Sequence, residues 1–236
     1  VIFQKINLNP MALPINLRPR FAAIVNATKD AHRHGDLFRP ERVGASFRGF
    51  QQRMLSRFYA GEMLLDHKSL LGYKYILRFD AIQVRITSAF SYDPFERAQV
   101  LKSVYNFHST VVDSPVTVIN PLLKKWLDTY NFAGKLMKPF VNKEGNEINH
   151  NGRAYSQSAE LFNLDAFKTT TYRTLFESTD AACEFLLGDT HETTSLTSGQ
   201  FLGIAMPFVA AKTPGAVTYL DALPIQHPID LDDLYT

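Results

Sequence analysis

The tightest group of side chains that could do chemistry is the run His32-Arg33-His34-Gly35-Asp36. Two imidazoles one residue apart can chelate a metal ion from an extended strand, with a carboxylate nearby. Here the run follows a segment with helical periodicity, and the positive charge of Arg33 disfavours a bound cation. The pattern therefore favours a helix-capping or phosphate-facing role, and we predict no metal site.

The single cysteine, Cys183, raises the question of nucleophilic catalysis, because Asp189 and His191 follow it closely. A cysteine nucleophile needs a base and an orienting carboxylate close in space. The neighbours of the cysteine, Ala181-Ala182 before it and Phe185-Leu186 after it, are typical of a buried helix face. A buried, unreactive thiol is therefore the favoured interpretation.

The remaining short motifs give no catalytic signature. Ser195 and Ser198 lie in a polar stretch without the flanking glycines of a hydrolase elbow. A phosphate-binding glycine loop, a paired-cysteine zinc site and a calcium loop are all absent from the sequence. The acidic residues at 230–233 fit a solvated or partner-facing tail better than a divalent-ion site. We therefore predict no catalytic residues, no cofactor and no small-molecule substrate.

Arginines are concentrated between residues 33 and 57, where they are interleaved with phenylalanines. The guanidinium group binds phosphate through two parallel hydrogen bonds, and aromatic rings can stack on unpaired bases. We therefore predict a nucleic-acid-binding face, for which RNA is the expected ligand. The alternatives are an ordinary solvated basic face and a face that pairs with the acidic C-terminal segment. The predicted binding residues are Arg33, Arg39, Arg42, Arg48, Arg53 and Arg57.

Charge changes sign along the chain. Residues 1–110 hold 16 Lys and Arg against 8 Asp and Glu, residues 111–180 hold 8 against 8, and residues 181–236 hold 1 against 7. The formal net charge of +2 is thus the sum of +8, 0 and −6. Such asymmetry indicates that the basic third binds a polyanion or the acidic end of another copy.

Bulk composition limits the class of protein. With 236 residues, 45% hydrophobic and 12% aromatic, the chain can bury a substantial core. One cysteine cannot form an internal disulfide, which fits a reducing compartment. No apolar run is long enough for a membrane span, and the first residues show no signal-peptide pattern.

The local patterns favour helices over much of the chain. Apolar residues recur at helical spacing over 20–32 and from Pro40 to Phe58. Asp93-Pro94 predicts a helix start whose apolar stripe continues to His108, and Asn120-Pro121 predicts another. A shorter helix is expected over 181–187.

Other segments fit strands or turns. Residues 82–87 alternate apolar and polar side chains, as do residues 73–79 in the opposite phase, which suits strands joined by a bulge. A continuous helix from Glu62 is the alternative. Residues 140–152 fit an exposed loop or a small hairpin, and residues 169–176 fit either class.

These elements predict a mainly α fold: a helical body at 21–206 with a minor β or hairpin element, between extended arms at 1–20 and 207–236. Prolines recur along both arms and prevent helices there, and the apolar residues of the arms must be buried against another surface. The arms either wrap their own domain or lie on neighbouring subunits.

The first functional hypothesis is a non-enzymatic, self-assembling homo-oligomer: a viral coat or nucleocapsid subunit that contacts RNA, in a virion or the host cytoplasm. The second is an enzyme whose site is assembled from dispersed residues, with His32, His34, Asp36 and His108 as candidates. The third is an adaptor that binds a protein partner through an aromatic groove.

Overall fold

A computed structural model describes much of the chain from residue 53 onward. The described residues are 15, 18–19, 53–80, 85–112, 115–116, 119–130, 137–144, 147–182, 184–185, 196–212, 216–220 and 223–226. The predicted N-terminal arm and the helix over 20–32 therefore fall mostly outside them, as does most of the helix predicted from Pro40.

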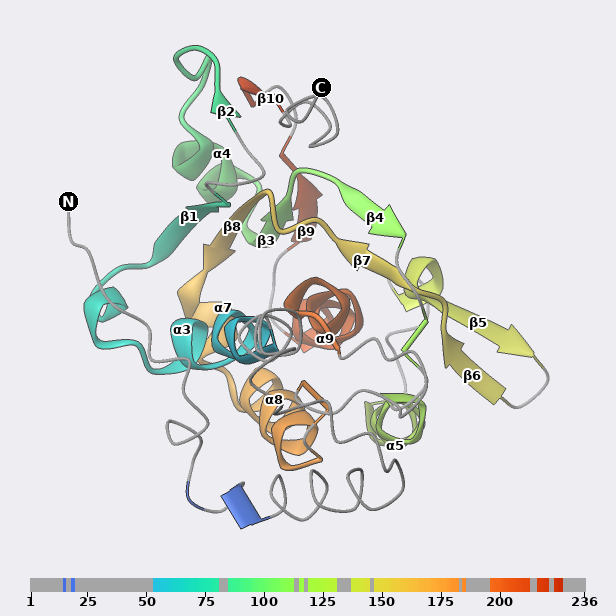
Figure 1. The fold of residues 1–236 in the computed structure, drawn as a ribbon. Coiled ribbons are helices and arrows are strands. Elements are labelled where there is room, and N and C mark those ends of the chain that lie inside the picture. The colour runs from blue at the N-terminus through green and yellow to red at the C-terminus, as the bar shows by residue number, and fades with distance from the viewer. Residues whose placement is uncertain are drawn as a thin grey trace, which may run out of the picture.

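Helices and strands alternate along the described residues (Figure 1). After a helical stretch at 53–60, the helices are α3 (Glu62–Leu65), η3 (Lys68–Leu70), α4 (Pro94–Val100), α5 (Asn120–Tyr130), η5 (Lys138–Phe140), α7 (Leu164–Phe167), α8 (Thr170–Ala181) and α9 (Ser198–Lys212). The strands are β1 (Tyr75–Phe79), β2 (Arg85–Ile86), β3 (Ser103–Phe107), β4 (Thr110–Val112), β5 (Val141–Glu144), β6 (Glu147–His150), β7 (Arg153–Tyr155), β8 (Ala159–Asn163), β9 (Ala216–Tyr219) and β10 (Ile225–Gln226).

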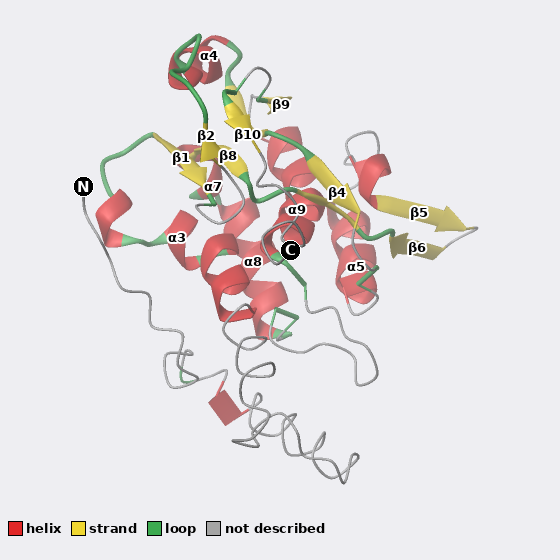
Figure 2. Cartoon of the chain, turned by 45° about the horizontal axis from the view of Figure 1, so that its top comes forward, coloured by secondary structure: helices red, strands yellow, loops and turns green. Residues whose placement is uncertain are grey.

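A four-stranded sheet in the order β1-β8-β3-β9 organises the fold. β8 is antiparallel to both of its neighbours, whereas β3 and β9 are parallel. Two-stranded pairs surround the sheet: β2 with β10, β4 with β7, and the β5–β6 hairpin (Figure 2). The fold is therefore mixed α/β, and the prediction of a mainly α fold is wrong.

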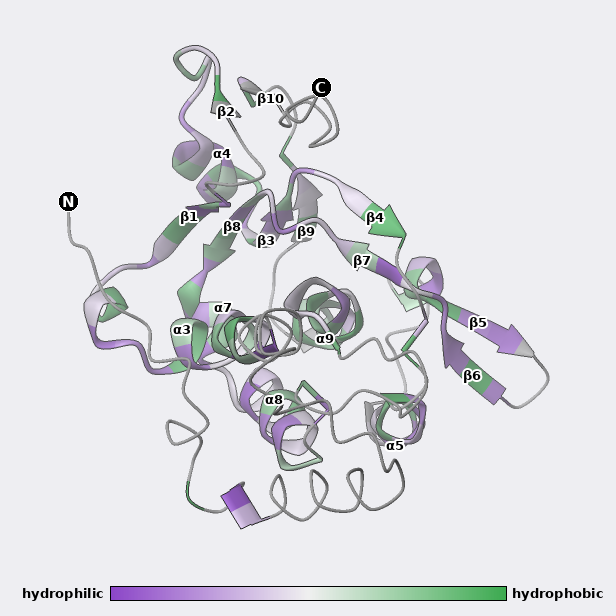
Figure 3. Ribbon diagram, in the orientation of Figure 1, coloured by the Kyte–Doolittle hydropathy of each residue, from purple (hydrophilic) through white to green (hydrophobic). Residues whose placement is uncertain are grey.

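The sheet separates two hydrophobic clusters of unequal size. Successive β8 residues belong to different clusters: Leu161 packs with Ala98 of α4, whereas Phe162 packs with the helices on the other face. This division follows from the alternation of side chains along a strand. The larger cluster is built on α3, α7, α8 and α9, whose hydrophobic segments lie in the middle of the view in Figure 3.

Helix α9 lies in the interior of the larger cluster. All of its residues from 198 to 209 are buried, so it lacks the polar stripe of a surface helix. Gly199 and Gly203 allow its close approach, because an added Cβ would lie 2.1 Å from the Tyr155 carbonyl oxygen or 2.6 Å from the Phe140 ring. The predicted arm boundary at residue 207 falls inside this helix, which continues through Pro207; the three-part division of the chain stays a prediction.

Two helix starts predicted from capping residues are confirmed. The Asp93 carboxylate accepts hydrogen bonds from the backbone N–H groups of Phe95 and Glu96, and Pro94 is the first residue of α4. Helix α5 begins at Asn120 as expected. The β5–β6 hairpin and the strands β1 and β2 also agree with the patterns that predicted them.

Two other local interpretations are wrong or are decided by the structure. The stripe from Val100 to His108 does not continue α4, because that helix ends at Val100 and β3 begins at Ser103. Residues 170–181 form helix α8, with the Thr169 hydroxyl capping it through the Tyr172 N–H. The shorter helix expected at 181–187 therefore does not begin at Ala181, where α8 ends.

Candidate functional site

Three strands of the sheet end at the same edge. β1, β3 and β9 all run in one direction, because β8 is antiparallel to β1 and to β3 while β9 is parallel to β3. Open α/β sheets bind their ligands outside the carboxyl ends of such strands. We call this edge of the sheet the carboxyl edge. Its residues are Asp80 after β1, His108 after β3, Tyr219 at the end of β9 and Ser158 before β8.

Backbone hydrogen bonds fix the carboxyl edge in place. The Asp80 N–H donates to the Ser158 carbonyl at 3.0 Å, and the His108 N–H donates to the Ala159 carbonyl at 3.1 Å. The Leu220 N–H donates to the Phe107 carbonyl at 2.7 Å. Residues far apart in the sequence are thereby held side by side on a rigid sheet, which is what a binding site requires.

An aromatic pair lies at the β3–β9 end of this edge. The rings of His108 and Tyr219 are stacked, with centroids 6.0 Å apart and an interplanar angle of 20°. Tyr219 is 50% exposed, although its backbone belongs to the sheet. An exposed aromatic face at a strand end can stack on a base or on the apolar face of a sugar.

A buried polar cluster lies just inside the carboxyl edge. Arg78 of β1 and Glu160 of β8 are direct partners in the strand register, and their side chains form an ion pair between Nη2 and Oε2. The Tyr105 hydroxyl donates to Glu160 Oε1 at 2.5 Å. Both oxygens of the Glu160 carboxylate are therefore engaged by the chain itself.

The guanidinium of Arg78 contacts an aromatic ring in addition to its ion pair with Glu160. It lies 4.2 Å from the centroid of the Tyr59 ring, a cation–π geometry. Burial lowers the pKa of Arg78, and Tyr105, Tyr59 and Asp80 oppose that shift. Its Nε and Nη1 atoms are buried without a hydrogen-bond partner.

Burial raises the pKa values of Tyr105, Tyr155 and Tyr172 above the ordinary tyrosine value. A raised folded-state pKa means that the native protein keeps these protons at a pH where the unfolded chain has lost them. Their contribution to stability is therefore complete below about pH 10, the pKa of an unperturbed tyrosine, and is lost as the pH rises above it. We expect the free energy of unfolding to fall above this pH, measured by urea denaturation. Absorbance at 295 nm measures the ionisation of the tyrosines in the native protein. If all of them ionised with the pKa of an unperturbed tyrosine, about 10, this expectation would be contradicted.

A surface pocket of roughly 770 Å³ lies away from the carboxyl edge. It is formed between α5 and the β5–β6 hairpin, and its lining includes Leu127, Lys138 and Lys143. None of the carboxyl-edge residues contributes to it, so its size alone does not make it the site.

Of the six arginines predicted to bind nucleic acid, the structure describes Arg53 and Arg57. Arg57 is buried, and its guanidinium donates to both carboxylate oxygens of Asp180 on α8, at 2.6 and 2.7 Å. Arg57 therefore pairs with a carboxylate in the interior and does not belong to an exposed basic face. Arg53 lies half-buried in the same helical stretch. Arg33, Arg39, Arg42 and Arg48 lie outside the described residues.

The other sequence candidates are mostly outside the described residues as well: His32, His34, Asp36, Cys183, Asp189, His191, Ser195 and the acidic residues at 230–233. Ser198 is described and buried at the start of α9. His108 is the one candidate of the dispersed-site hypothesis that the structure places at the carboxyl edge. Sequence reasoning missed Asp80, Ser158 and Tyr219, because each lies next to a short strand or at its end, without any local motif.

Solved structures with the same fold are mannosyltransferases. Core-mannan synthase A from Aspergillus fumigatus, in a form with Mn and GDP, aligns with a TM-score of 0.62 and 20% identity over 93% of this chain and 56% of that chain. The mannosyltransferase Ktr4p from S. cerevisiae, in complex with GDP, aligns with a TM-score of 0.65 and 15% identity over 94% of this chain and 54% of that chain. The chain thus spans little more than half the length of these proteins. No curated protein sequence is similar enough to be matched with it.

A family model describes most of the chain. The model for glycolipid 2-alpha-mannosyltransferase matches residues 20–189, more than half of the 236 residues. A family of sugar transferases contradicts the hypothesis of a non-enzymatic coat subunit. The predictions that depended on this hypothesis are therefore wrong as well. They are the RNA partner, the self-assembly, the lack of a small-molecule substrate, and the virion or host-cytoplasm location. The match over residues 20–189 shows that the chain belongs to the glycolipid 2-alpha-mannosyltransferase family.

Proposed function

We propose that the protein transfers an α-mannosyl group from GDP-mannose to a hydroxyl of a mannose-bearing acceptor, and that the donor binds at the carboxyl edge. The observation that carries this proposal is the meeting of the ends of β1, β3 and β9 at one edge, in a fold shared with GDP-bound mannosyltransferases. The family assignment supports the same reaction.

The side chains of the carboxyl edge suit a nucleotide sugar. The exposed Tyr219 ring, backed by His108, offers a stacking surface for the base or the sugar. Asp80 supplies a carboxylate that can accept hydrogen bonds from sugar hydroxyls. In the reaction the bond between the mannose C1 and the diphosphate breaks, and a new bond forms from C1 to the acceptor oxygen, whose proton is released.

One of the similar structures contains Mn together with GDP. Within the described residues, no three His, Cys, Asp or Glu side chains gather closely enough to hold a metal ion. Glu160, the carboxylate just inside the edge, is engaged at both oxygens by Arg78 and Tyr105. The described side chains therefore do not fit a divalent metal here, and no step is assigned to one.

None of the helices in the described residues is both long and apolar enough to cross a membrane.

The direct test is to incubate the full chain with GDP-mannose and methyl α-mannoside, and to measure GDP release and the linkage of the product by NMR. UDP-glucose serves as the control donor. We expect mannosyl transfer from GDP-mannose and none of glucose from UDP-glucose. Absence of transfer from GDP-mannose would contradict the proposal.

A variant pair locates the donor site. Tyr219→Ala removes an exposed ring whose stacking on a base would contribute about 1–3 kcal/mol, so we expect kcat/KM for GDP-mannose to fall by roughly 5- to 150-fold. Leu71→Gln is the control, because Leu71 is 61% exposed and precedes β1 at the opposite end of that strand. Equal activity of the Tyr219→Ala and Leu71→Gln proteins would place the donor elsewhere.

A further inference from the structure

The pocket between α5 and the β5–β6 hairpin has the size and the lining of a small-molecule site. Its volume of roughly 770 Å³ lies within the range of about 300–1,000 Å³ that such sites occupy. Four of its lining side chains are apolar: Leu127, Met137, Val141 and Ile148. Met137 belongs to the larger hydrophobic cluster and the other three pack against it. The apolar wall of the pocket is therefore continuous with the core.

The two walls of this pocket are fixed to each other beside it. The β5–β6 hairpin forms a two-stranded sheet of its own, and it lies next to α5 in Figures 1 and 2. Asn120 at the start of α5 donates from Nδ2 to Asn149 Oδ1 at 2.7 Å and accepts from the His150 N–H at 3.0 Å. Leu127 lies about 10 Å further along the helix axis. The pocket is thus preformed by anchored elements.

Two lysines give the pocket a positive charge. Lys138 of η5 and Lys143 of β5 both line it, and both are exposed. In the part of the chain that the structure describes, neither ammonium group takes part in an ion pair or a hydrogen bond. Two cations without counter-ions beside an apolar cavity attract an anion whose apolar part can be buried.

The surrounding acidic residues do not cancel this charge at the pocket. Asp128 follows Leu127 on α5, and Glu147 is paired in register with Glu144 at the far end of the hairpin. Neither Asp128 nor Glu147 lines the pocket. The adjoining sequence at 131–136 contains one lysine and no acidic residue. The local charge therefore favours an anionic ligand.

We propose that this pocket binds a single-chain lipid phosphate, with the alkyl chain on the apolar wall and the phosphate between Lys138 and Lys143. A phosphate monoester carries a charge of about −1.5 to −2 at pH 7, which matches two ammonium groups. The ligand binds as a monomer, because a concave pocket can enclose one chain whereas a bilayer presents its headgroups on a plane. The pocket shares no residue with the carboxyl edge, so this second site is independent of the proposed function.

The first experiment measures binding of decyl phosphate to the full chain by isothermal titration calorimetry, below the concentration at which it forms micelles. Each buried methylene strengthens binding about fourfold, so we expect decyl phosphate to bind about 15-fold more tightly than octyl phosphate. Inorganic phosphate and decyl maltoside, which lack the chain and the charge respectively, are expected to bind at least about tenfold more weakly. Equal affinities for decyl and octyl phosphate, or for decyl phosphate and decyl maltoside, would overturn the inference.

Variants locate the site. Lys138→Gln and Lys143→Gln each remove one ammonium group from the pocket, and we expect each to weaken binding of decyl phosphate about five- to tenfold. Lys168→Gln is the matched control, because it makes the same charge change on an exposed residue at the end of α7. Circular dichroism confirms that the variants are folded. Unchanged affinity in both pocket variants, or an equal loss in Lys168→Gln, would show that the ligand does not bind here.

Two further measurements exclude other sources of the signal. Saturating GDP is expected to leave the affinity for decyl phosphate unchanged, and displacement would place the ligand at the nucleotide site instead. Sedimentation with phosphatidylcholine vesicles containing phosphatidic acid tests the bilayer. We expect the wild type and Lys143→Gln to sediment equally. If Lys143→Gln instead loses vesicle binding as it loses decyl phosphate, the pocket is part of a membrane contact and the single-chain ligand is wrong.

Discussion

Replacement of Asp180 by alanine is expected to lower the free energy of unfolding by about 3–5 kcal/mol, among the largest effects of any single substitution in this protein. Asp180 on α8 accepts two hydrogen bonds from Arg57 in the helical stretch at 53–60, at 2.6 and 2.7 Å. The two side chains are only 8% and 12% exposed. Without the carboxylate, the guanidinium would be buried with no counter-charge, and its desolvation would no longer be offset.

Urea denaturation followed by circular dichroism measures this loss. Glu177→Ala is the control on the same helix. The Glu177 side chain is 62% exposed and its carboxylate lies 3.8 Å from Arg173, so its loss is expected to cost less than about 1 kcal/mol. The double variant Arg57→Met with Asp180→Leu is expected to recover most of the stability, because no buried charge remains. Similar losses for Asp180→Ala and Glu177→Ala would show that the pair does not hold the two helices together.

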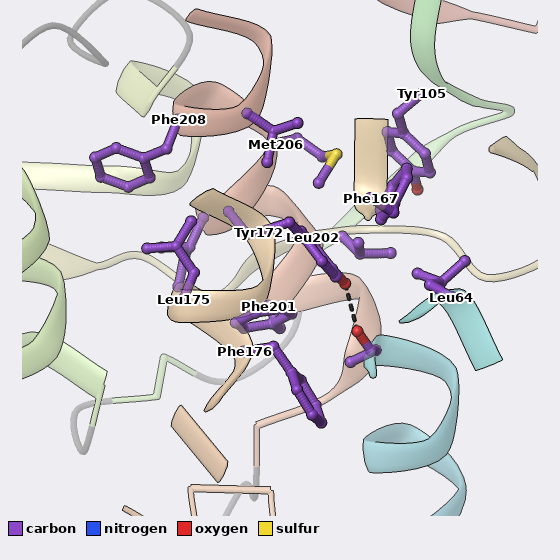
Figure 4. Packing of buried hydrophobic residues seen from close by; sticks show 14 of the residues in the cluster. Leu64, Tyr105, Phe167, Tyr172, Leu175, Phe176, Phe201, Leu202, Met206 and Phe208 are labelled. Atoms are coloured by element: carbon purple, nitrogen blue, oxygen red, sulfur yellow. Dashed lines mark hydrogen bonds between the residues drawn. The ribbon is translucent and has the colours of Figure 1, made fainter. Parts of the chain in front are cut away.

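Replacement of Phe201 by alanine is expected to lower the free energy of unfolding by about 3–5 kcal/mol, because it opens a cavity in the larger hydrophobic cluster. Phe201 of α9 is 0% exposed. Its ring centroid lies 5.4 Å from that of Phe185, 5.8 Å from Tyr172 and 6.2 Å from Phe176. Figure 4 shows Phe201 of α9 near Tyr172 and Phe176 of α8.

The same denaturation measurement tests this variant, with near-ultraviolet circular dichroism to report the packing of the aromatic rings. Phe95→Ala serves as the control, because Phe95 is 36% exposed on α4 and belongs to neither hydrophobic cluster. We expect the control to lose less than about 1 kcal/mol, as surface substitutions usually do. If Phe201→Ala loses no more than this, α9 does not form the centre of the core.

Segments whose structure depends on adjacent residues could be predicted from the sequence. The Asp93 cap of α4 requires only a side chain and the backbone within three residues of it. Helix α5 begins at Asn120, as the Asn-Pro pair indicated, although the Asn120 side chain bonds to Asn149 and to the backbone of His150 on β6. The β5–β6 hairpin pairs residues at most nine positions apart, so its turn residues were sufficient to indicate it.

The central sheet could not be predicted in this way. β3 was interpreted as part of a helical stripe and β9 as part of an extended arm, because strands of four or five residues contain too few positions to distinguish their period from that of a helix. Their pairing joins Phe107 to Tyr219, more than 100 residues apart. Only burial on both faces of the sheet decides such a pairing, and burial is a property of the folded chain.

The arginine-rich segment shows the same limit for function. Its composition indicated a phosphate-binding surface, but Arg57 pairs with Asp180 in the interior, a partner 123 residues away. Charge along a sequence does not distinguish a solvated cation from one that a distant carboxylate neutralises.

A substantial core, the capped start of α4 and the β5–β6 hairpin could be read from the sequence, because they depend on composition and on neighbouring residues. Tertiary structure alone decided which strand ends meet. Asp80, His108, Ser158 and Tyr219 form one edge only because β1, β8, β3 and β9 align through backbone hydrogen bonds, and the free energy of that alignment comes from burying side chains drawn from the whole chain.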